Sequence, residues 1–146
     1  MIHIYGIGSP FGADQIGNIV LDGLKQVLDK NSVAIQYDVG SGFQLIEYMQ
    51  GAKELHIIDA MITGQLPGTL LHFHVNEITP LYNPLLSTHG CHLAEIIELN
   101  RILGYLPDKT FLHGVEIDRD NQLTDKLLQS CEMLVQELVQ YIFKPN

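Results

Sequence analysis

Residues 2–28 read IHIYGIGSPFGADQIGNIVLDGLKQVL, and this stretch decides the fold. Residues 2–7 are mostly apolar and end among glycines, which is typical of a short buried strand. From Ile16 onward, apolar residues recur at helical spacing as far as Leu28. The glycine-rich residues between the two segments predict a tight loop. The stretch therefore predicts a strand, a loop and a helix in succession, the repeating unit of an α/β fold.

The same alternation of strand and helix continues along the chain. Short apolar or alternating runs indicate the strands, and apolar residues at helical spacing indicate the helices. The third helix has Ser87 or Thr88 near its predicted start, where a hydroxyl can cap the first turn. We expect strands at 2–7, 33–39, 55–60, 70–75 and 110–117, and helices at 16–28, 43–49, 93–103 and 123–142.

The fourth strand is expected to run against the others. A parallel crossover needs roughly a dozen residues or more, and no helix fits between residues 60 and 70. This strand should therefore be antiparallel and lie at an edge of the sheet. The predicted architecture is a three-layer α/β/α fold with a mostly parallel five-stranded sheet, one strand being antiparallel. Residues 1–146 should form a single domain.

Composition excludes several classes of protein. The chain has 146 residues, 46% of them hydrophobic, which suffices for one core. Its 17 acidic and 8 basic residues give a formal charge of −9, so nucleic acid is not an expected partner. No apolar run approaches the ~20 residues that span a bilayer, and we expect no membrane partner and a cytoplasmic location. The two cysteines, Cys91 and Cys131, are expected to be reduced.

Three polar residues mark a candidate site. Ligands of open α/β sheets bind beyond the carboxyl ends of the strands. We expect Asp14 after the first strand, Asp59 at the end of the third and His89 before the third helix, all at that edge. Two carboxylates and an imidazole suit a divalent first-row ion with open coordination positions. From residue types alone, capping of helices by Asp14 and residues 87–89 is the simpler interpretation.

Other sequence features compete with this site. The turn Gly6-Ile7-Gly8 suggests a nucleotide site, but Phe11 stands where the third glycine of the dinucleotide motif belongs. Cys91 lies between two histidines and is chemically able to act as a nucleophile, although a lone cysteine is more often structural. The segment around Ser41 lacks the spacing of a serine-hydrolase motif.

Further polar groups have both a site interpretation and a surface interpretation. Histidines three apart at a helix start, or two apart on a strand, share one face and can chelate a metal, but they occur equally well on solvated faces. These groups are His89, His92 and Glu95 around the start of the third helix, His72 and His74 on the fourth strand, and His113 and Glu116 at the end of the fifth.

Four short motifs carry a family resemblance. They are GIGSPFGAD at 6–14, IIDA at 57–60, STHG at 87–90 and GVEI at 114–117. In this order and spacing they resemble the hydrogenase maturation endopeptidases over nearly the whole chain. The resemblance implies a nickel-dependent, aspartic-type endopeptidase. Such an enzyme removes the C-terminal peptide of a nickel–iron hydrogenase large-subunit precursor after nickel insertion.

The resemblance also implies site residues. It makes Asp14 and Asp59 the catalytic carboxylates, and Asp14, Asp59 and His89 the metal ligands. The nickel can be supplied by the substrate, and other divalent ions can substitute for it. The nucleophile stays unassigned, because a carbonyl polarised by the metal and a water activated by it, with Asp14 as a base, are both compatible with these residues.

The loop after the first strand departs from the family pattern, which is close to GxGNxLxxD followed by Asp or Glu. An ungapped alignment puts Gln15 at the second acidic place, whereas a loop shorter by one residue puts Asp14 there and Ala13 at the first. We prefer the shorter loop, because a carboxylate is a better oxygen ligand for nickel than an amide. Ser9 and Phe11 also replace family residues, which indicates a divergent subgroup.

Two other functions stay open at this point. Ala13 and Gln15 suggest a homologue that binds metal or precursor without cleaving it. Alternatively, an α/β module would bind a nucleotide through Gly6 and Gly8. All three predicted ligands are expected in loops, so that replacing them should leave the fold intact.

Overall fold

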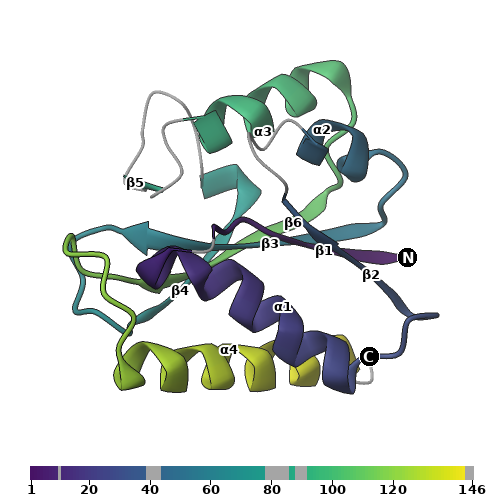
Figure 1. Cartoon of the computed structure of the whole chain (residues 1–146). Helices are drawn as coiled ribbons and strands as arrows, with labels where there is room; N and C mark the ends of the chain where they lie inside the picture. Colours follow the sequence, from purple (N-terminus) through teal and green to yellow (C-terminus); the bar gives the residue numbers. More distant parts are fainter. Residues whose placement is uncertain (10, 39–43, 78–85, 88–91, 144–146) are drawn as a thin grey trace.

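A computed structural model describes residues 1–9, 11–38, 44–77, 86–87 and 92–143 (Figure 1). Its strands form one six-stranded sheet with the order β2-β1-β3-β6-β4, and β5 pairs with β3 off this path. The strands are β1 (Ile2–Gly6), β2 (Val33–Tyr37), β3 (Glu54–Ile62), β4 (Leu70–His74), β5 (Leu86–Ser87) and β6 (Lys109–Glu116). The helices are α1 (Ile16–Val27), α2 (Gln44–Met49), α3 (His92–Leu103) and α4 (Asp125–Phe143), with 3-10 turns η1 (Gly12–Gln15) and η2 (Val75–Glu77).

The predicted strand directions are confirmed. β2, β1, β3 and β6 are mutually parallel, whereas β4 is antiparallel to β6 and lies at the end of the sheet order. β6 lies between β3 and β4, so the antiparallel strand is not adjacent to the strand that precedes it in the chain. The five predicted strands are all present. The sixth, β5, was not predicted, since two residues are too few to produce a periodic pattern.

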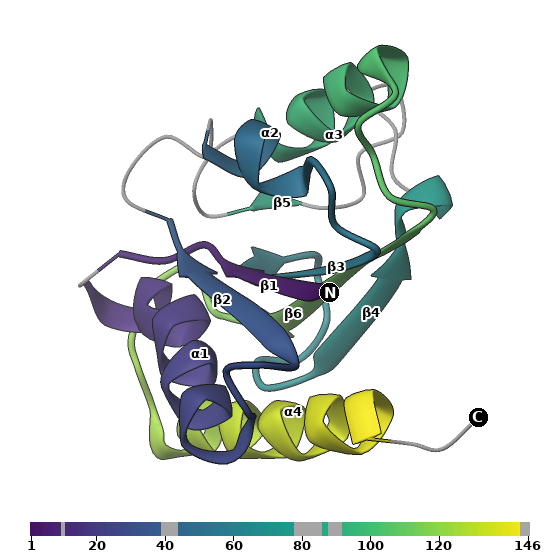
Figure 2. The same cartoon turned by 90° about the vertical axis from the view of Figure 1, so that its right-hand side faces the viewer.

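Helices cover both faces of the sheet, as the three-layer prediction requires. Figure 2 shows α1 and α4 on one side of the strands and α2 and α3 on the other. Successive side chains of a strand point to opposite faces. On β3, Ile58 and Ala60 join the core under α1 and α4, whereas Ile57 and Met61 join the core under α2 and α3. The central strands are thus apolar on both faces, as expected for a parallel sheet between two helical layers.

The predicted helix at 93–103 is confirmed as α3, which begins at His92. The predicted capping by Ser87 was wrong, because residues 86–87 form β5, and Thr88 lies outside the described residues. Met61 and Ile62 at the end of β3 pair antiparallel with Ser87 and Leu86. The backbone hydrogen bonds of residues 86–87 are therefore used by the sheet, and a helix cannot begin there.

Helix α1 approaches the end of β1 unusually closely. A Cβ atom built on Gly17 would lie 2.0 Å from the carbonyl oxygen of Ile7, and one on Gly6 would lie 2.5 Å from Leu21 Cδ1. The contact between helix and strand therefore requires both glycines, because a side chain at either position would collide with the opposite element. This contact sets where the loop between β1 and α1 must run. Among the described helices, none is long and apolar enough to cross a lipid bilayer.

We predict that Gly17→Ala destabilises the fold by roughly 2–4 kcal/mol, because the added methyl meets a backbone oxygen that side-chain motion cannot displace. Gly23→Ala is the matched control: it lies in the same helix, and its methyl meets the Val135 side chain at 2.9 Å. Both variants gain the same helix propensity, about 1 kcal/mol. Urea unfolding measures the difference, and equal stabilities of the two variants would contradict the proposed contact.

Candidate functional site

Asp59 lies inside β3, not at its end as predicted. β3 continues to Ile62 because Met61 and Ile62 pair with β5, and Met61 also pairs with Glu116 of β6. On the other side, β1 ends at Gly6, which is opposite Ile58. Asp59 is therefore one position beyond the end of β1, at the carboxyl edge of the parallel sheet. Its side chain is fully buried and lies on the α2 and α3 face, since it alternates with Ile58 and Ala60.

Asp14 lies in η1, and it does not cap α1. The N-cap position belongs to Gln15, which makes no side-chain capping bond. The Oδ1 atom of Asp14 is buried and accepts no hydrogen bond from any residue that the structure describes. A buried carboxylate oxygen without a donor is costly, and such atoms in native proteins often indicate a ligand, ion or water. The capping interpretation of Asp14 is therefore wrong.

The turn that carries Asp14 lies beside the strand that carries Asp59. η1 packs against β3, and Ala13 is buried in the same core cluster as Ile58 and Ala60 of that strand. The amide of Ser9 donates a 3.0 Å hydrogen bond to the carbonyl oxygen of Asp14. The loop after β1 therefore folds back on itself over the end of the sheet. The structure brings these two predicted site residues to neighbouring elements at one edge.

Asn121 holds this turn in place, and the sequence did not indicate that role. Its backbone has φ 57°, the left-handed region, and its carbonyl oxygen accepts a 2.9 Å hydrogen bond from Ala13. A Cβ atom on Gly12 would lie 2.1 Å from that same oxygen, so glycine is required opposite Asn121. The loop after β6 and the loop after β1 are thereby joined. The only sequence signal is an asparagine in a polar turn, which tolerates this backbone conformation.

Asp38 is a second residue that sequence reasoning missed. It follows β2, the neighbour of β1, and the hydroxyl of buried Tyr5 donates a hydrogen bond to its Oδ1 atom. Burial raises the pKa of Tyr5, and Asp38 raises it further, so the phenol stays protonated and remains a donor. The sequence pattern predicts a strand as far as residue 39, which places Asp38 inside it, whereas β2 ends at Tyr37 and Asp38 follows its carboxyl end.

The remaining predicted ligand lies outside the described residues. His89 and Cys91 belong to residues 88–91, so the structure does not test the imidazole ligand or the cysteine nucleophile. Glu95 is exposed on α3. Within the described part of the chain, no three His, Cys, Asp or Glu side chains converge as a metal site. A complete site at this edge therefore needs a group from residues 88–91 or from a substrate.

Glu116 has a structural role, and the surface interpretation of it was wrong. Its side chain is 1% exposed, and Oε2 accepts hydrogen bonds from the amides of Thr63 at 2.7 Å and Gly64 at 3.3 Å. The Thr63 hydroxyl donates to Oε1. This carboxylate thus satisfies the turn that follows β3. His72 and His113 lie on the opposite face of the sheet from Asp59, beside α4, and do not contribute to the edge.

The glycines after β1 have a packing explanation. A Cβ atom on Gly8 would lie 2.9 Å from the side-chain oxygen of Asn18, and the Gly6 position is filled by Leu21. Packing against helix α1 therefore explains both glycines without a bound nucleotide.

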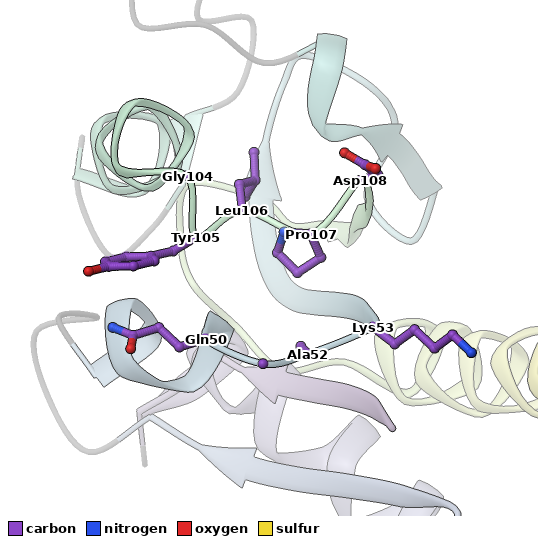
Figure 3. A pocket seen from close by; sticks show the side chains of 9 residues that line it. Gln50, Ala52, Lys53, Gly104, Tyr105, Leu106, Pro107 and Asp108 are labelled. Atoms are coloured by element: carbon purple, nitrogen blue, oxygen red, sulfur yellow. The ribbon is translucent and has the colours of Figure 1, made fainter.

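A surface pocket of about 600 Å³ lies at the other edge of the sheet. Figure 3 shows it between residues 50–53, which precede β3, and residues 104–108, which precede β6. Both segments lead into the amino ends of parallel strands. The pocket is therefore separate from the carboxyl edge that carries Asp14 and Asp59.

The donor set at the carboxyl edge fits a divalent cation. Asp14 offers a buried oxygen without a protein donor, and Asp59 adds a second buried carboxylate on the adjacent strand. A buried carboxylate beside a second one with a buried oxygen is favoured when a cation compensates their charge. Oxygen donors of this kind, completed by an imidazole, suit a borderline first-row metal.

Comparisons with known proteins agree with the fold. The family model HycI, hydrogenase maturation protease, matches residues 20–144. The hydrogenase 2 maturation protease of Escherichia coli (strain K12) is 28% identical over 117 residues, which cover 78% of this chain and 71% of that protein. The matched segment of the family model includes Asp59 and His89 but begins after Asp14.

Solved structures share the same architecture. An endopeptidase from Escherichia coli is 25% identical, with a TM-score of 0.82 over 98% of this chain and 91% of that one. The [NiFe] hydrogenase maturation protease HybD from Thermococcus kodakarensis is 20% identical, with a TM-score of 0.72 over 97% and 98%. The second likeness supports the fold alone.

We predict that Asn121→Ala loosens the Asp14 turn, because alanine pays roughly 1–2 kcal/mol in left-handed backbone, which corresponds to amide exchange of Ala13 faster by about 5- to 30-fold. Asn121→Gly is the control: it keeps the backbone conformation and the carbonyl acceptor, and exchange should stay within about twofold. Hydrogen exchange followed by NMR measures both. If both variants exchange equally fast, the side-chain amide holds the turn, and the backbone explanation fails.

Proposed function

Because the chain belongs to the hydrogenase maturation protease family, we propose that it is an endopeptidase that removes the C-terminal peptide of a nickel–iron hydrogenase large-subunit precursor. One observation of the structure carries the assignment of the active edge. The orphaned Oδ1 of Asp14 lies in a turn packed against the strand that holds buried Asp59. An unpaired buried carboxylate oxygen lowers the stability of a fold, whereas in an enzyme of this family it can bind a ligand.

Nickel is proposed as part of the substrate: a precursor that already contains nickel would present it to this edge. Asp14 and Asp59 would hold the ion, together with His89 from outside the described residues. When bound, a divalent ion supplies positive charge that polarises the peptide carbonyl to be cleaved. Three protein ligands leave coordination positions open for ligands of the precursor. The endopeptidase would thereby distinguish a loaded precursor from an empty one.

The residues of this chain have separate tasks in the proposal. Asp59, fixed inside a nine-residue central strand, gives the site its rigid ligand. Asp14, on a turn held by Ser9 and Asn121, gives the second ligand and is the group placed to accept a proton from an attacking water. Rigid supports of this kind lower the cost of arranging the reacting groups.

A noncatalytic homologue is the second candidate. Ala13, which takes the place of the family's first acidic residue in the preferred alignment, is fully buried in the core. A carboxylate at that position would have to be buried in the core, so the alanine found there supports this second candidate. If that acid is needed for cleavage, the chain would bind the precursor without processing it.

Asp59→Asn is predicted to reduce processing of a nickel-loaded large-subunit precursor by roughly 100-fold or more, because it removes a charged ligand while preserving side-chain size. The amide is chosen over alanine because Asp59 is buried in the central strand and a cavity there would destabilise the fold. Asp108→Asn is the charge-matched control, on an exposed side chain at the opposite edge. The readout is the mass of the released peptide.

The outcomes separate the two candidates. Processing by the wild type and the Asp108 variant, but not by Asp59→Asn, supports the endopeptidase. Binding of the precursor by the wild type without any release of peptide supports the noncatalytic homologue instead.

A second prediction decides which residue occupies the ligand position. Asp14→Asn should weaken Ni²⁺ binding by about tenfold or more without lowering the unfolding midpoint, because the replaced oxygen has no protein donor to lose. Gln15→Asn, which moves the neighbouring amide back by one methylene, should leave Ni²⁺ binding within about twofold. Calorimetric titration with Ni²⁺ measures both variants, and the reverse order of effects would assign the ligand to Gln15.

A further inference from the structure

Five side chains form a continuous hydrogen-bonded run between α4 and the sheet. Glu54 Oε1 lies 2.8 Å from His56 Nε2, and His56 Nδ1 lies 2.7 Å from His113 Nε2. His113 Nδ1 lies 2.8 Å from His72 Nδ1, and His72 Nε2 lies 2.9 Å from Glu137 Oε2. Every ring nitrogen of the three histidines is therefore in contact with another member of this histidine run.

The histidine run connects three strands to one helix. Its members come from β3, β6, β4 and the second half of α4, which crosses those strands in Figure 2. His56 and His113 are 1% and 7% exposed, whereas the side chains of His72 and Glu137 are 44% and 50% exposed. The run thus begins in the interior and ends in solvent. It lies on the face of the sheet opposite Asp59, so the proposed catalytic edge does not use it.

Counting protons shows that neutral histidines cannot make all four contacts. Each contact places two nitrogen or oxygen atoms at 2.7 to 2.9 Å and needs one hydrogen between them. A neutral imidazole has one N–H, so three of them supply three hydrogens, and an ionised carboxylate supplies none. One contact would then bring two lone pairs together. Four contacts therefore require one proton more than the neutral rings carry.

We propose that the histidine run is a binding site for one proton, held on His72 between His113 and Glu137, and that this proton fastens α4 to the edge of the sheet. Charge is least costly at the exposed end of the run, and imidazole is more basic than carboxylate. With His72 doubly protonated, the donors follow in one direction. His72 Nδ1–H donates to His113, His113 Nε2–H donates to His56, and His56 Nε2–H donates to Glu54.

Neighbouring groups support this direction of the bonds. The Tyr141 hydroxyl of α4 bonds to Glu54, so the inner carboxylate has polar partners on two sides, Tyr141 and His56. His74 of β4 meets the ring of Phe111 edge-on. Among the residues that the structure describes, Glu54, Glu137 and Tyr141 are the titratable groups that contact the three rings from β3 and α4, and His74 of β4 lies one ring away, across Phe111 of β6.

The inner histidines remain neutral in the folded protein. Burial, with the neighbouring His56 and His72, lowers the pKa of His113 to about 2. Burial also lowers the pKa of His56, against the opposing effect of Glu54. Both histidines bind protons in the unfolded chain below about pH 6.5, so stability falls as the pH falls below that value. The extra proton has the opposite effect on stability. The folded run holds it at a pH where the unfolded chain has released it, so this contribution to stability falls as the pH rises.

A metal site is not the explanation for this cluster. Its nitrogen atoms face one another in pairs along a line, each pair at hydrogen-bond distance, whereas metal ligands converge on one point. The histidine run therefore binds protons and not a metal ion. The experiment must test whether it binds one extra proton.

The Glu137→Gln variant tests that count. A carboxamide can donate to His72 Nε2, so the run becomes complete with three neutral rings and needs no extra proton. From pH 7 to 9, the unfolding equilibrium constant of the wild type should rise relative to that of Glu137→Gln, by up to about tenfold per pH unit. Glu132→Gln, an exposed residue of the same helix outside the run, should follow the wild type at every pH. Urea unfolding of the full chain at each pH measures all three proteins.

Long-range ¹⁵N–¹H NMR of the imidazole rings measures the protonation state and tautomer of each histidine, independently of stability. At pH 6.5 we expect His72 doubly protonated, and His56 and His113 neutral with the proton on Nε2. The proposal would be overturned by a neutral His72 or a charged His113 at that pH. It would also be overturned if the ratio of the unfolding constants of the wild type and Glu137→Gln did not change with pH.

Discussion

The close contact between helix α1 and the end of strand β1 is the constraint on which the site depends. Gly17 lies so near the Ile7 carbonyl that no side chain fits between them, and Gly6 makes room for Leu21 in the same way. With helix and strand this close, the loop between them must turn outward over the carboxyl edge of the sheet. The η1 turn, with Asp14 on it, is the result, and Asn121 holds it from the loop after β6.

Strand β3 serves two functions because its side chains alternate between the faces of the sheet. Asp59, at the proposed catalytic edge, points toward the α2 and α3 layer, and His56 points toward α4, where the histidine run lies. Both side chains are almost fully buried, so each must satisfy its polar atoms within the protein or with a bound ion. A single central strand thus supplies one ligand of the proposed cleavage site and one member of the proposed proton site.

Most of the fold could be predicted because its elements are long and periodic. Helix α4 and the parallel strands repeat apolar residues often enough to indicate type and direction, and the antiparallel edge strand followed from a connection too short for a crossover. The errors occurred where local pattern carries little information. Strand β5 has two residues, and Ser87 pairs with Met61, which is distant in sequence, instead of capping a helix. Asp59 was expected at a strand end for the same reason.

The sequence by itself determined the α/β class, the antiparallel edge strand and the choice of Asp14 and Asp59, because hydrophobic periodicity and residue chemistry are local properties. Only the tertiary structure decided that Asp14 keeps an unpaired buried oxygen, that Glu116 closes a turn, and that three histidines from three strands meet in a line. Those facts depend on which strands lie side by side and which face each residue occupies. Such contacts join residues more than forty positions apart, as with His56 and His113, and no local pattern records them.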